Sequence, residues 1–197
     1  MLPEFTNAPI DCKRKFHTSE VEENFNITDF WKWNQSNLLE NRTRGILAEY
    51  LVMKALSLQS HSRKEWENWD LITSEGVKIE IKSASYIQSW RQSNYSNITF
   101  NIRETKRFNP DTNTYAGTLG RHSDVYIFCL LHCKDQSSID PMDLNQWSFF
   151  IIPTAVLNQN LGGQKTIGLK RLNAMAHANC SFHQLKEAFQ RVVDLLK

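Results

Sequence analysis

Three carboxylates and one lysine are the residues of this chain best suited to chemistry. Glu80 and Lys82 flank Ile81, Asp70 lies ten residues before Glu80, and Glu49 lies further upstream in a run with helical spacing. Mg²⁺ prefers oxygen ligands and commonly binds through one or two carboxylates together with waters and a substrate phosphate. An ammonium group beside them adds a positive charge for the phosphate. The set therefore indicates a site for a hard divalent cation next to a phosphate.

A tight β-hairpin is predicted around two of these carboxylates. Residues 68–73 and 77–82 are short runs rich in β-branched and aromatic residues, and they flank the loop 74–76. A three-residue loop that ends in Gly76 matches a type I turn followed by a left-handed residue. This loop pairs Leu71 with Ile79.

The same register places Asp70 directly opposite Glu80. Alternation along the strands predicts an apolar, core-facing side made of Trp69, Leu71, Thr73, Val77, Ile79 and Ile81. The other side carries Asp70, Ile72, Lys78, Glu80 and Lys82. Like charges opposed on an antiparallel pair destabilise it, so a fold that keeps them must supply a cation. The alternative is a solvated hairpin face with incidental charges, since Glu-x-Lys is a common tripeptide.

Upstream, a helix is predicted over residues 37–58, with Asn37 and Glu40 forming a capping box at its start. Apolar residues near helical spacing predict its buried stripe, namely Leu39, Ile46, Leu47, Tyr50, Met53 and Leu56. Glu49 flanks this stripe. It either joins the carboxylate set or is a surface residue paired with a nearby Arg or Lys.

These residues resemble the PD-(D/E)XK nuclease superfamily. The matching pattern is Arg-Gly-Ile-Leu-Ala-Glu at 44–49, then Asp70, then Glu-Ile-Lys at 80–82, within about residues 37–92. The Gly-x-x-x-Glu helix is also similar to that of archaeal Holliday junction resolvases. Trp69 stands where the name-giving proline would be. The resemblance implies an α/β, restriction-endonuclease-like core, with a mixed central β-sheet flanked by helices.

The resemblance also implies a mechanism. Asp70, Glu80 and the backbone carbonyl of Ile81 would hold Mg²⁺ or Mn²⁺, with Glu49 as a direct or water-mediated ligand. Such an ion polarises the scissile phosphate and lowers the pKa of a bound water. Lys82 would orient or deprotonate that water and offset the developing negative charge.

Nucleic-acid contacts are expected from four further residues. Ser83 and Gln88 follow on the same segment and would touch phosphate or a metal-bound water, unless they are ordinary polar residues. Arg42 and Arg44 lie in the first turns of the predicted helix, where the helix dipole favours acidic residues, so they are expected to face an external anion. The net charge of +2 is no strong nucleic-acid signature in itself.

Length and composition bound the organisation of the chain. Its 197 residues suit one domain, with residues 1–36 as an N-terminal extension and 37–197 as a single nuclease-like domain. The aromatic segment 30–33 is expected to pack on the core. No apolar run could span a membrane and no signal-peptide pattern is seen, so a cytoplasmic protein is expected. The four cysteines then point to free thiols.

Further elements are predicted along the second half. An alternating strand is expected at 97–103, and nearly continuous apolar runs predict buried strands at 124–131 and 146–152. Residues 104–123 are expected to form a long polar loop lining a substrate groove. Ser181 is the expected N-cap of a final amphipathic helix ending at about Leu195 or Leu196, with Phe182, Leu185, Phe189, Val192 and Leu196 on one side.

The sequence thus predicts a metal-dependent endonuclease that acts on DNA, of restriction or host-defence type. A structure-selective junction or repair nuclease is the nearest alternative. A nucleic-acid-binding module that keeps the fold without catalysis is the alternative from a different class. Cutting both strands of a duplex is most simply done by two active sites, which favours a homodimer.

Overall fold

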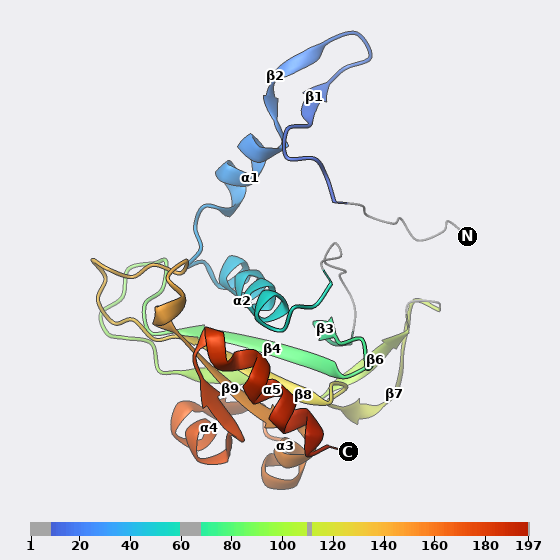
Figure 1. Ribbon diagram of the computed structural model, residues 1–197, viewed down its shortest axis with the longest axis vertical. Coiled ribbons are helices and arrows are strands. Elements are labelled where there is room, and N and C mark those ends of the chain that lie inside the picture. The colour runs from blue at the N-terminus through green and yellow to red at the C-terminus, as the bar shows by residue number, and fades with distance from the viewer. Residues whose placement is uncertain (1–8, 60–67, 110–111, 197) are drawn as a thin grey trace.

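A five-stranded mixed β-sheet forms the centre of the molecule (Figure 1). The computed structural model describes residues 9–59, 68–109 and 112–196. The strand order is β11 (Ala178–Cys180), β9 (Trp147–Pro153), β8 (Val125–Leu131), β4 (Lys78–Ser85) and β3 (Leu71–Ile72). In this sheet, as far as the described residues go, β4 and β8 pair in parallel and the other neighbouring strands pair antiparallel. The expected α/β fold with a mixed central sheet and flanking helices is confirmed.

The middle strands form because their side chains are apolar on both faces. Every residue of β8 is buried, and its β-branched and aromatic side chains suit a strand covered on each side. β9 is nearly as apolar and ends at Pro153, which precedes the helix α3 (Thr154–Leu161). Both predicted central strands are therefore confirmed.

Helices and a small second sheet cover the two faces. α2 (Asn41–Ala55) and α5 (Leu185–Asp194) pack with one core cluster, which includes Ile79 and Ile81. α3, α4 (Leu169–Met175) and the antiparallel pair of β5 (Thr99–Asn101) with β10 (Thr166–Gly168) enclose the other. In the part of the chain that the structure describes, no helix is long and apolar enough to cross a membrane.

The strand predicted at 97–103 corresponds to β5, and its alternation is confirmed. Ile98, Phe100 and Ile102 are buried, whereas Thr99 and Asn101 are exposed. β5 pairs with β10 rather than with the central sheet.

The helix α2 begins later than predicted. The side chain of Glu40 accepts hydrogen bonds from the backbone N–H groups of Arg42 (3.0 Å) and Thr43 (2.9 Å), so Glu40 is the N-cap. The predicted capping box opening at Asn37 is wrong, because the helix starts at Asn41. Glu40 fills the cap position with its own carboxylate, and this interaction satisfies two free backbone donors.

The buried stripe of α2 also differs from the prediction. Arg44, Ala48, Leu51 and Val52 are its buried residues, whereas Tyr50 is 50% exposed. Apolar residues surround most of this helix, so their spacing fits more than one stripe. Packing against the sheet selects the one centred on Ala48.

The final helix follows its prediction closely. Ser181 contacts the side chain of Gln184 through both its N–H (3.1 Å) and its hydroxyl (2.9 Å), and a short 3₁₀ turn, Phe182–Gln184, leads into α5. Leu185, Phe189 and Val192 are buried as predicted, together with Ala188 and Val193. Leu196 is 41% exposed and does not belong to that face.

The segment 104–123 is not the loop that was expected. It contains two antiparallel strands, β6 (Thr105–Asn109) and β7 (Thr114–Gly120), which lie beside the β3 edge of the sheet (Figure 1). Their side chains are mostly exposed on both faces, so no apolar alternation marks them. A further 3₁₀ turn, Leu144–Gln146, precedes β9.

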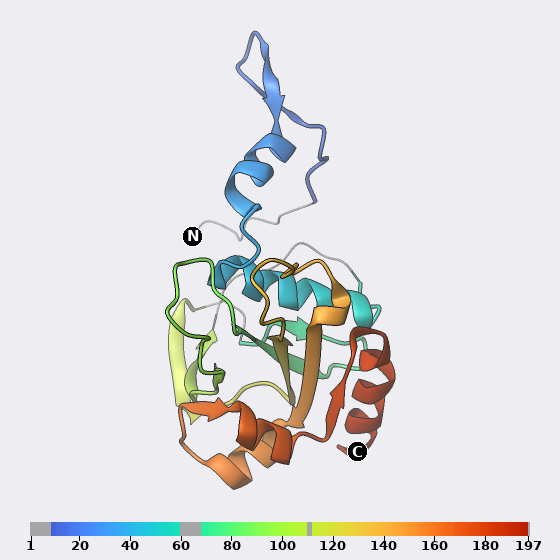
Figure 2. The same cartoon turned by 90° about the vertical axis from the view of Figure 1, so that its left-hand side faces the viewer.

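The N-terminal residues form an arm that stands away from the sheet and its helices (Figures 1 and 2). It consists of the hairpin β1 (Lys15–His17) and β2 (Glu22–Asn26) followed by α1 (Ile27–Gln35). No residue of α1 is buried, and Trp33 is 82% exposed. The expected packing of residues 30–33 on the core does not occur. Their rings make local contacts instead, such as Phe30 with Trp33 at 6.4 Å between centroids.

Candidate active site

The hairpin that carries the candidate residues has the predicted register. Leu71 pairs with Ile79, and Gly76 adopts the left-handed conformation with φ of +84°. The N–H of Thr73 donates to the carbonyl of Val77 over 3.0 Å and closes the loop. Glycine adopts this φ without the strain that a Cβ would bring, so the sequence determines the turn and the turn determines the register.

One residue departs from the predicted face assignment. Trp69 was expected on the core side, but its ring lies 4.5 Å from the ammonium of Lys78 in a cation–π contact. Trp69 precedes the short strand β3, where regular alternation no longer applies. The other apolar positions of that side, including Leu71 and Ile79, do pack in the core.

Asp70 is held firmly at the start of the hairpin. Its N–H donates to the carbonyl of Ile79 (3.0 Å), and its Oδ2 accepts a hydrogen bond from the N–H of Ile81 (2.6 Å). Burial, followed by the charges of Glu80 and Glu49, raises the pKa of the Asp70 carboxyl to about 7. This carboxylate therefore lies where its negative charge is opposed by its surroundings.

Glu80 and Lys82 form an ion pair on the same strand. Lys82 Nζ lies 2.5 Å from Glu80 Oε1, and the two side chains are 30% and 20% exposed. Burial lowers the pKa of Lys82, but the charge of Glu80, their hydrogen bond and the charges of Asp70 and Glu49 outweigh it, so the pKa is raised overall. Lys82 is consequently a cation at neutral pH, suited to orienting a water or a phosphate and not to accepting a proton.

Glu49 belongs to the same electrostatic cluster. It lies on α2, and its charge acts on both Asp70 and Lys82. The structure thus brings the four sequence-predicted residues of the site into one neighbourhood. Among the described residues, no group of three or more His, Cys, Asp and Glu side chains is arranged to hold a metal ion.

The donor set nevertheless fits a hard divalent cation. Two carboxylates, Asp70 and Glu80, are opposed at the hairpin, and Glu49 adds a third negative charge against the single ammonium of Lys82. Mg²⁺ usually needs only one or two carboxylates and completes its shell with waters and phosphate. A bound cation would relieve the repulsion that raises the pKa of Asp70.

Tyr126 lies beside Glu80 on the neighbouring strand, and nothing in the sequence pattern marks it. It lies opposite Glu80 in the parallel β4–β8 register and is 3% exposed. Burial and then the charge of Glu80 raise the pKa of its hydroxyl, so the phenol is neutral. Only the strand register, which the sequence leaves open, could have located it.

Arg44 does not face an external anion, so that prediction is wrong. It is 4% exposed, and its guanidinium donates to Ser83 Oγ (3.2 Å), Gln88 Oε1 (3.1 Å), Asn41 Oδ1 (2.8 Å) and the carbonyl of Leu39 (2.9 Å). A helical arginine that finds this many acceptors under the helix is a structural anchor.

The same network accounts for two other predicted contacts. Ser83 and Gln88 present their side-chain oxygens to Arg44, which favours the alternative that they are structural polar residues. Gln88 also donates to the carbonyl of Ser85 (2.8 Å). Arg42 lies exposed in the first turn of α2, so its contact with nucleic acid stays a prediction.

An α/β fold with a mixed central sheet, in which one hairpin presents opposed carboxylates and a neighbouring lysine, has the form expected of a nuclease. Comparison with protein-family models is consistent with this class: the family described as bacteriophage T4 endonuclease IV matches residues 2–171. Because the match covers well over half of the 197 residues, the chain belongs to this endonuclease family. Glu49, Asp70, Glu80 and Lys82 all lie within the matched part. No curated protein matches the chain.

Proposed function

We propose that this protein is a metal-dependent endonuclease that hydrolyses DNA phosphodiester bonds by PD-(D/E)XK chemistry, in a restriction or host-defence role. Membership of an endonuclease family supports the class. The observation that carries the finer proposal is the compact cluster of Asp70, Glu80 and Lys82 on one hairpin.

The carboxylates would hold Mg²⁺ or Mn²⁺. Asp70 and Glu80 are the ligands proposed, together with the carbonyl of Ile81 and, directly or through water, Glu49. When bound, the ion supplies a Lewis acid for the scissile phosphate and lowers the pKa of a bound water. The hydrogen bond from the N–H of Ile81 fixes the orientation of Asp70 for this role.

Lys82 would act through its positive charge. Its raised pKa keeps it protonated at neutral pH, so it can donate hydrogen bonds to the attacking water or to a phosphate oxygen. The sequence left open whether Lys82 orients the attacking water or takes a proton from it, and the raised pKa favours the orienting role. In the absence of substrate, Glu80 holds the ammonium close to the site.

Plasmid nicking in Mg²⁺, Mn²⁺ or EDTA tests the proposal. We expect wild-type cleavage that EDTA abolishes, and a loss of about 10²-fold or more in Asp70→Asn and in Lys82→Ala, because each removes one charge from the transition-state environment. Lys78→Ala is the matched control: Lys78 lies on the same strand and face as Lys82 but contacts Trp69.

Three results would count against the proposal. Unchanged cleavage in both site variants would show that Asp70 and Lys82 are not catalytic residues. Cleavage that continues in EDTA would show that the reaction needs no metal ion. DNA binding without any cleavage in the wild type would point to the silent binding module instead.

A further inference from the structure

The amide side chain of Asn68 joins the segment of the candidate site to the β6–β7 hairpin. Asn68 Nδ2 donates to the carbonyl of Phe108 (2.9 Å), and Asn68 Oδ1 accepts from the N–H of Phe108 (2.8 Å). Both hydrogen bonds are partly buried. Asn68 thus pairs with the outer edge of β6 as a neighbouring strand would, and it does so two residues before Asp70.

The connection from Asn68 to the carboxylates is short and hydrogen-bonded. The N–H of Asp70 is bonded to Ile79 and its side chain to Ile81, so the backbone next to Asn68 is fixed to β4. Two extended residues span only about 7 Å. The position of the β6–β7 hairpin relative to the candidate catalytic carboxylates therefore depends directly on Asn68.

The base of the hairpin is anchored independently. The buried guanidinium of Arg121, just after β7, donates to the carbonyl of Ile102 (2.8 Å) and of Gly162 (2.8 Å) and to Asn158 Oδ1 (2.7 Å). The ring of His122 contacts the carbonyl of Thr105 over 2.8 Å. The β6–β7 hairpin is thus hydrogen-bonded to the rest of the molecule both at Phe108 and at its base.

The surface of this hairpin suits a polyanion. Lys106 and Arg107 are both exposed on β6, and Arg107 directly precedes Phe108, the residue that Asn68 holds. The register of β6 with β7 shifts between Thr105 and Arg107, so the regular alternation of faces is interrupted at these two residues. Across the strands, the rings of Phe108 and Tyr115 lie 5.3 Å apart and stiffen the pair. Cationic side chains on a ribbon that is hydrogen-bonded beside the proposed active site are well placed for the phosphates that flank the cleaved bond.

We propose that the β6–β7 hairpin binds the sugar–phosphate backbone of the substrate strand through Lys106 and Arg107, and that Asn68 is the positioning residue that sets its distance from the carboxylates. This proposal rests on the proposed nuclease function. It assigns to the hairpin the binding of phosphates beside the scissile one, and to Asn68 no contact with the reacting atoms.

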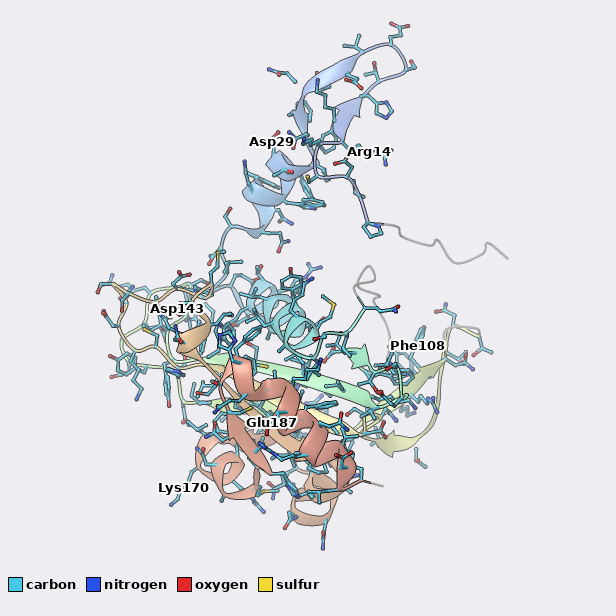
Figure 3. The ribbon with its side chains drawn as sticks, in the orientation of Figure 1. Arg14, Asp29, Phe108, Asp143, Lys170 and Glu187 are labelled. Carbon is cyan, nitrogen blue, oxygen red and sulfur yellow. The ribbon has the colours of Figure 1, made fainter. Side chains whose placement is uncertain are left out.

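Binding measured over a salt series tests the role of the two basic residues. Labelled DNA oligonucleotides, single- and double-stranded, are titrated in EDTA so that none is cut. For each of Lys106→Ala and Arg107→Ala we expect the slope of log K against log salt to fall in magnitude by about 0.7–0.9, the value for one lost phosphate contact. Lys170→Ala is the control, since Lys170 is exposed on α4, away from the hairpin (Figure 3). It should leave the slope unchanged.

Asn68→Ala and Asn68→Asp test the positioning role. The aspartate keeps an acceptor for the N–H of Phe108 but sets a carboxylate against its carbonyl, so both variants should release the hairpin. We expect faster hydrogen exchange at the Phe108 amide and weaker DNA binding. When Lys106→Ala and Arg107→Ala are added to Asn68→Ala, the further loss of DNA affinity should be smaller than when they are added to the wild type. The reason is that the displaced β6–β7 hairpin no longer holds those two charges near the DNA.

The outcomes separate this proposal from the function on which it rests. Wild-type salt slopes and cleavage in the Lys106 and Arg107 variants, with cleavage still dependent on Asp70 and Lys82, would overturn the hairpin proposal alone. Additive losses of DNA affinity in the combined variant would overturn the positioning role. Unchanged hydrogen exchange at the Phe108 amide in the Asn68 variants would overturn it as well. Cleavage that is insensitive to Asp70→Asn would overturn the proposed function instead.

Discussion

Asp70 is a carboxylate kept in surroundings that oppose its charge. Burial and the charges of Glu80 and Glu49 raise its pKa from 3.8 to about 7. The folded state therefore binds a proton at Asp70 more tightly than the unfolded state does. The favourable contribution of this group is fully present below its unfolded pKa and is lost as pH rises towards 7 and through it. At neutral pH and without metal, the ionised Asp70 carboxylate therefore lowers the stability of the folded protein.

This sign leads to a prediction for Asp70→Asn. The neutral amide keeps an oxygen for the N–H of Ile81 but removes the charge, so without metal at pH 8 the variant should be more stable than wild type by about 1 kcal/mol or more, roughly 2–4 °C in Tm. Between pH 4 and 8 the wild type should lose stability more steeply than the variant. Thermal melts in EDTA across this pH range measure both.

Asp135→Asn serves as the control for this prediction. Asp135 is exposed, and hydrogen bonds from the side chains of Ser138 and Ser137 lower the pKa of its carboxyl. Its contribution has the opposite sign, being present above the unfolded pKa and lost as pH falls, so the substitution should not stabilise the protein at pH 8. Equal melting curves for wild type and Asp70→Asn at every pH would contradict the account of Asp70.

Residue types and spacing were sufficient to place Asp70, Glu80 and Lys82 together on one hairpin, because one turn determines their register. They were not sufficient for Arg44, whose helix has apolar residues on most sides and therefore no unique buried face. Tyr126 could not be found either, since parallel pairing joins strands that are distant in sequence and leaves no local mark.

At the scale of elements, α2 is docked on β4 by a buried arginine. The guanidinium of Arg44 reaches Ser83 and Gln88, which follow the candidate catalytic residues of β4. This contact sets the position of α2, and with it that of Glu49, relative to the hairpin. A structural arginine thus orients the helix that supplies one of the site's carboxylates.

Arg44→Ala should destabilise the protein by roughly 2–4 kcal/mol, because it leaves partly buried acceptors on Ser83 and Gln88 without this donor and creates a cavity where the buried guanidinium lay. Urea unfolding measures this loss. Arg42→Ala, two positions earlier and exposed, should change stability by no more than about 0.5 kcal/mol. Equal stability of the two variants would show that the Arg44 network does not dock α2.

Strands that are buried on both faces were predicted well from the sequence, and strands that are exposed were not. β8 and β9, covered on both faces, are continuous apolar runs and were predicted almost to the residue. β6 and β7 were not, because their two faces are mostly exposed and their residues are polar. The left-handed residues Asn113 (φ 51°) and Gly117 (φ 85°) were the remaining local signals of a hairpin there.

At the scale of the whole molecule, the matched family region and the packed core do not coincide. Residues 2–171 include the exposed N-terminal arm, whereas β11 and α5 lie beyond them. Yet α5 contributes Leu185, Phe189 and Val192 to the core, and α1 contributes no buried residue. The arm is thus part of the family region without being part of the core.

Removing residues 1–36 should therefore leave the core folded. No buried side chain of α1 is lost, so Tm should change by less than about 3 °C, the effect of roughly 1 kcal/mol in a chain of this size. Calorimetry of the shortened and full chains measures the difference. Ending the chain before α5 is the contrasting change and should abolish cooperative unfolding. A large loss of Tm on removing the arm would show that it packs on the core after all.

The proposed mechanism requires a divalent cation bound between the opposed carboxylates of the β3–β4 hairpin. Crystals soaked in Mn²⁺ and measured at the manganese absorption edge would show this directly. We expect an anomalous peak within coordination distance of Asp70 and Glu80 that disappears in Asp70→Asn. A wild-type enzyme that cleaves DNA in Mn²⁺ while its crystals show no peak there, or a peak elsewhere, would contradict the proposed mechanism.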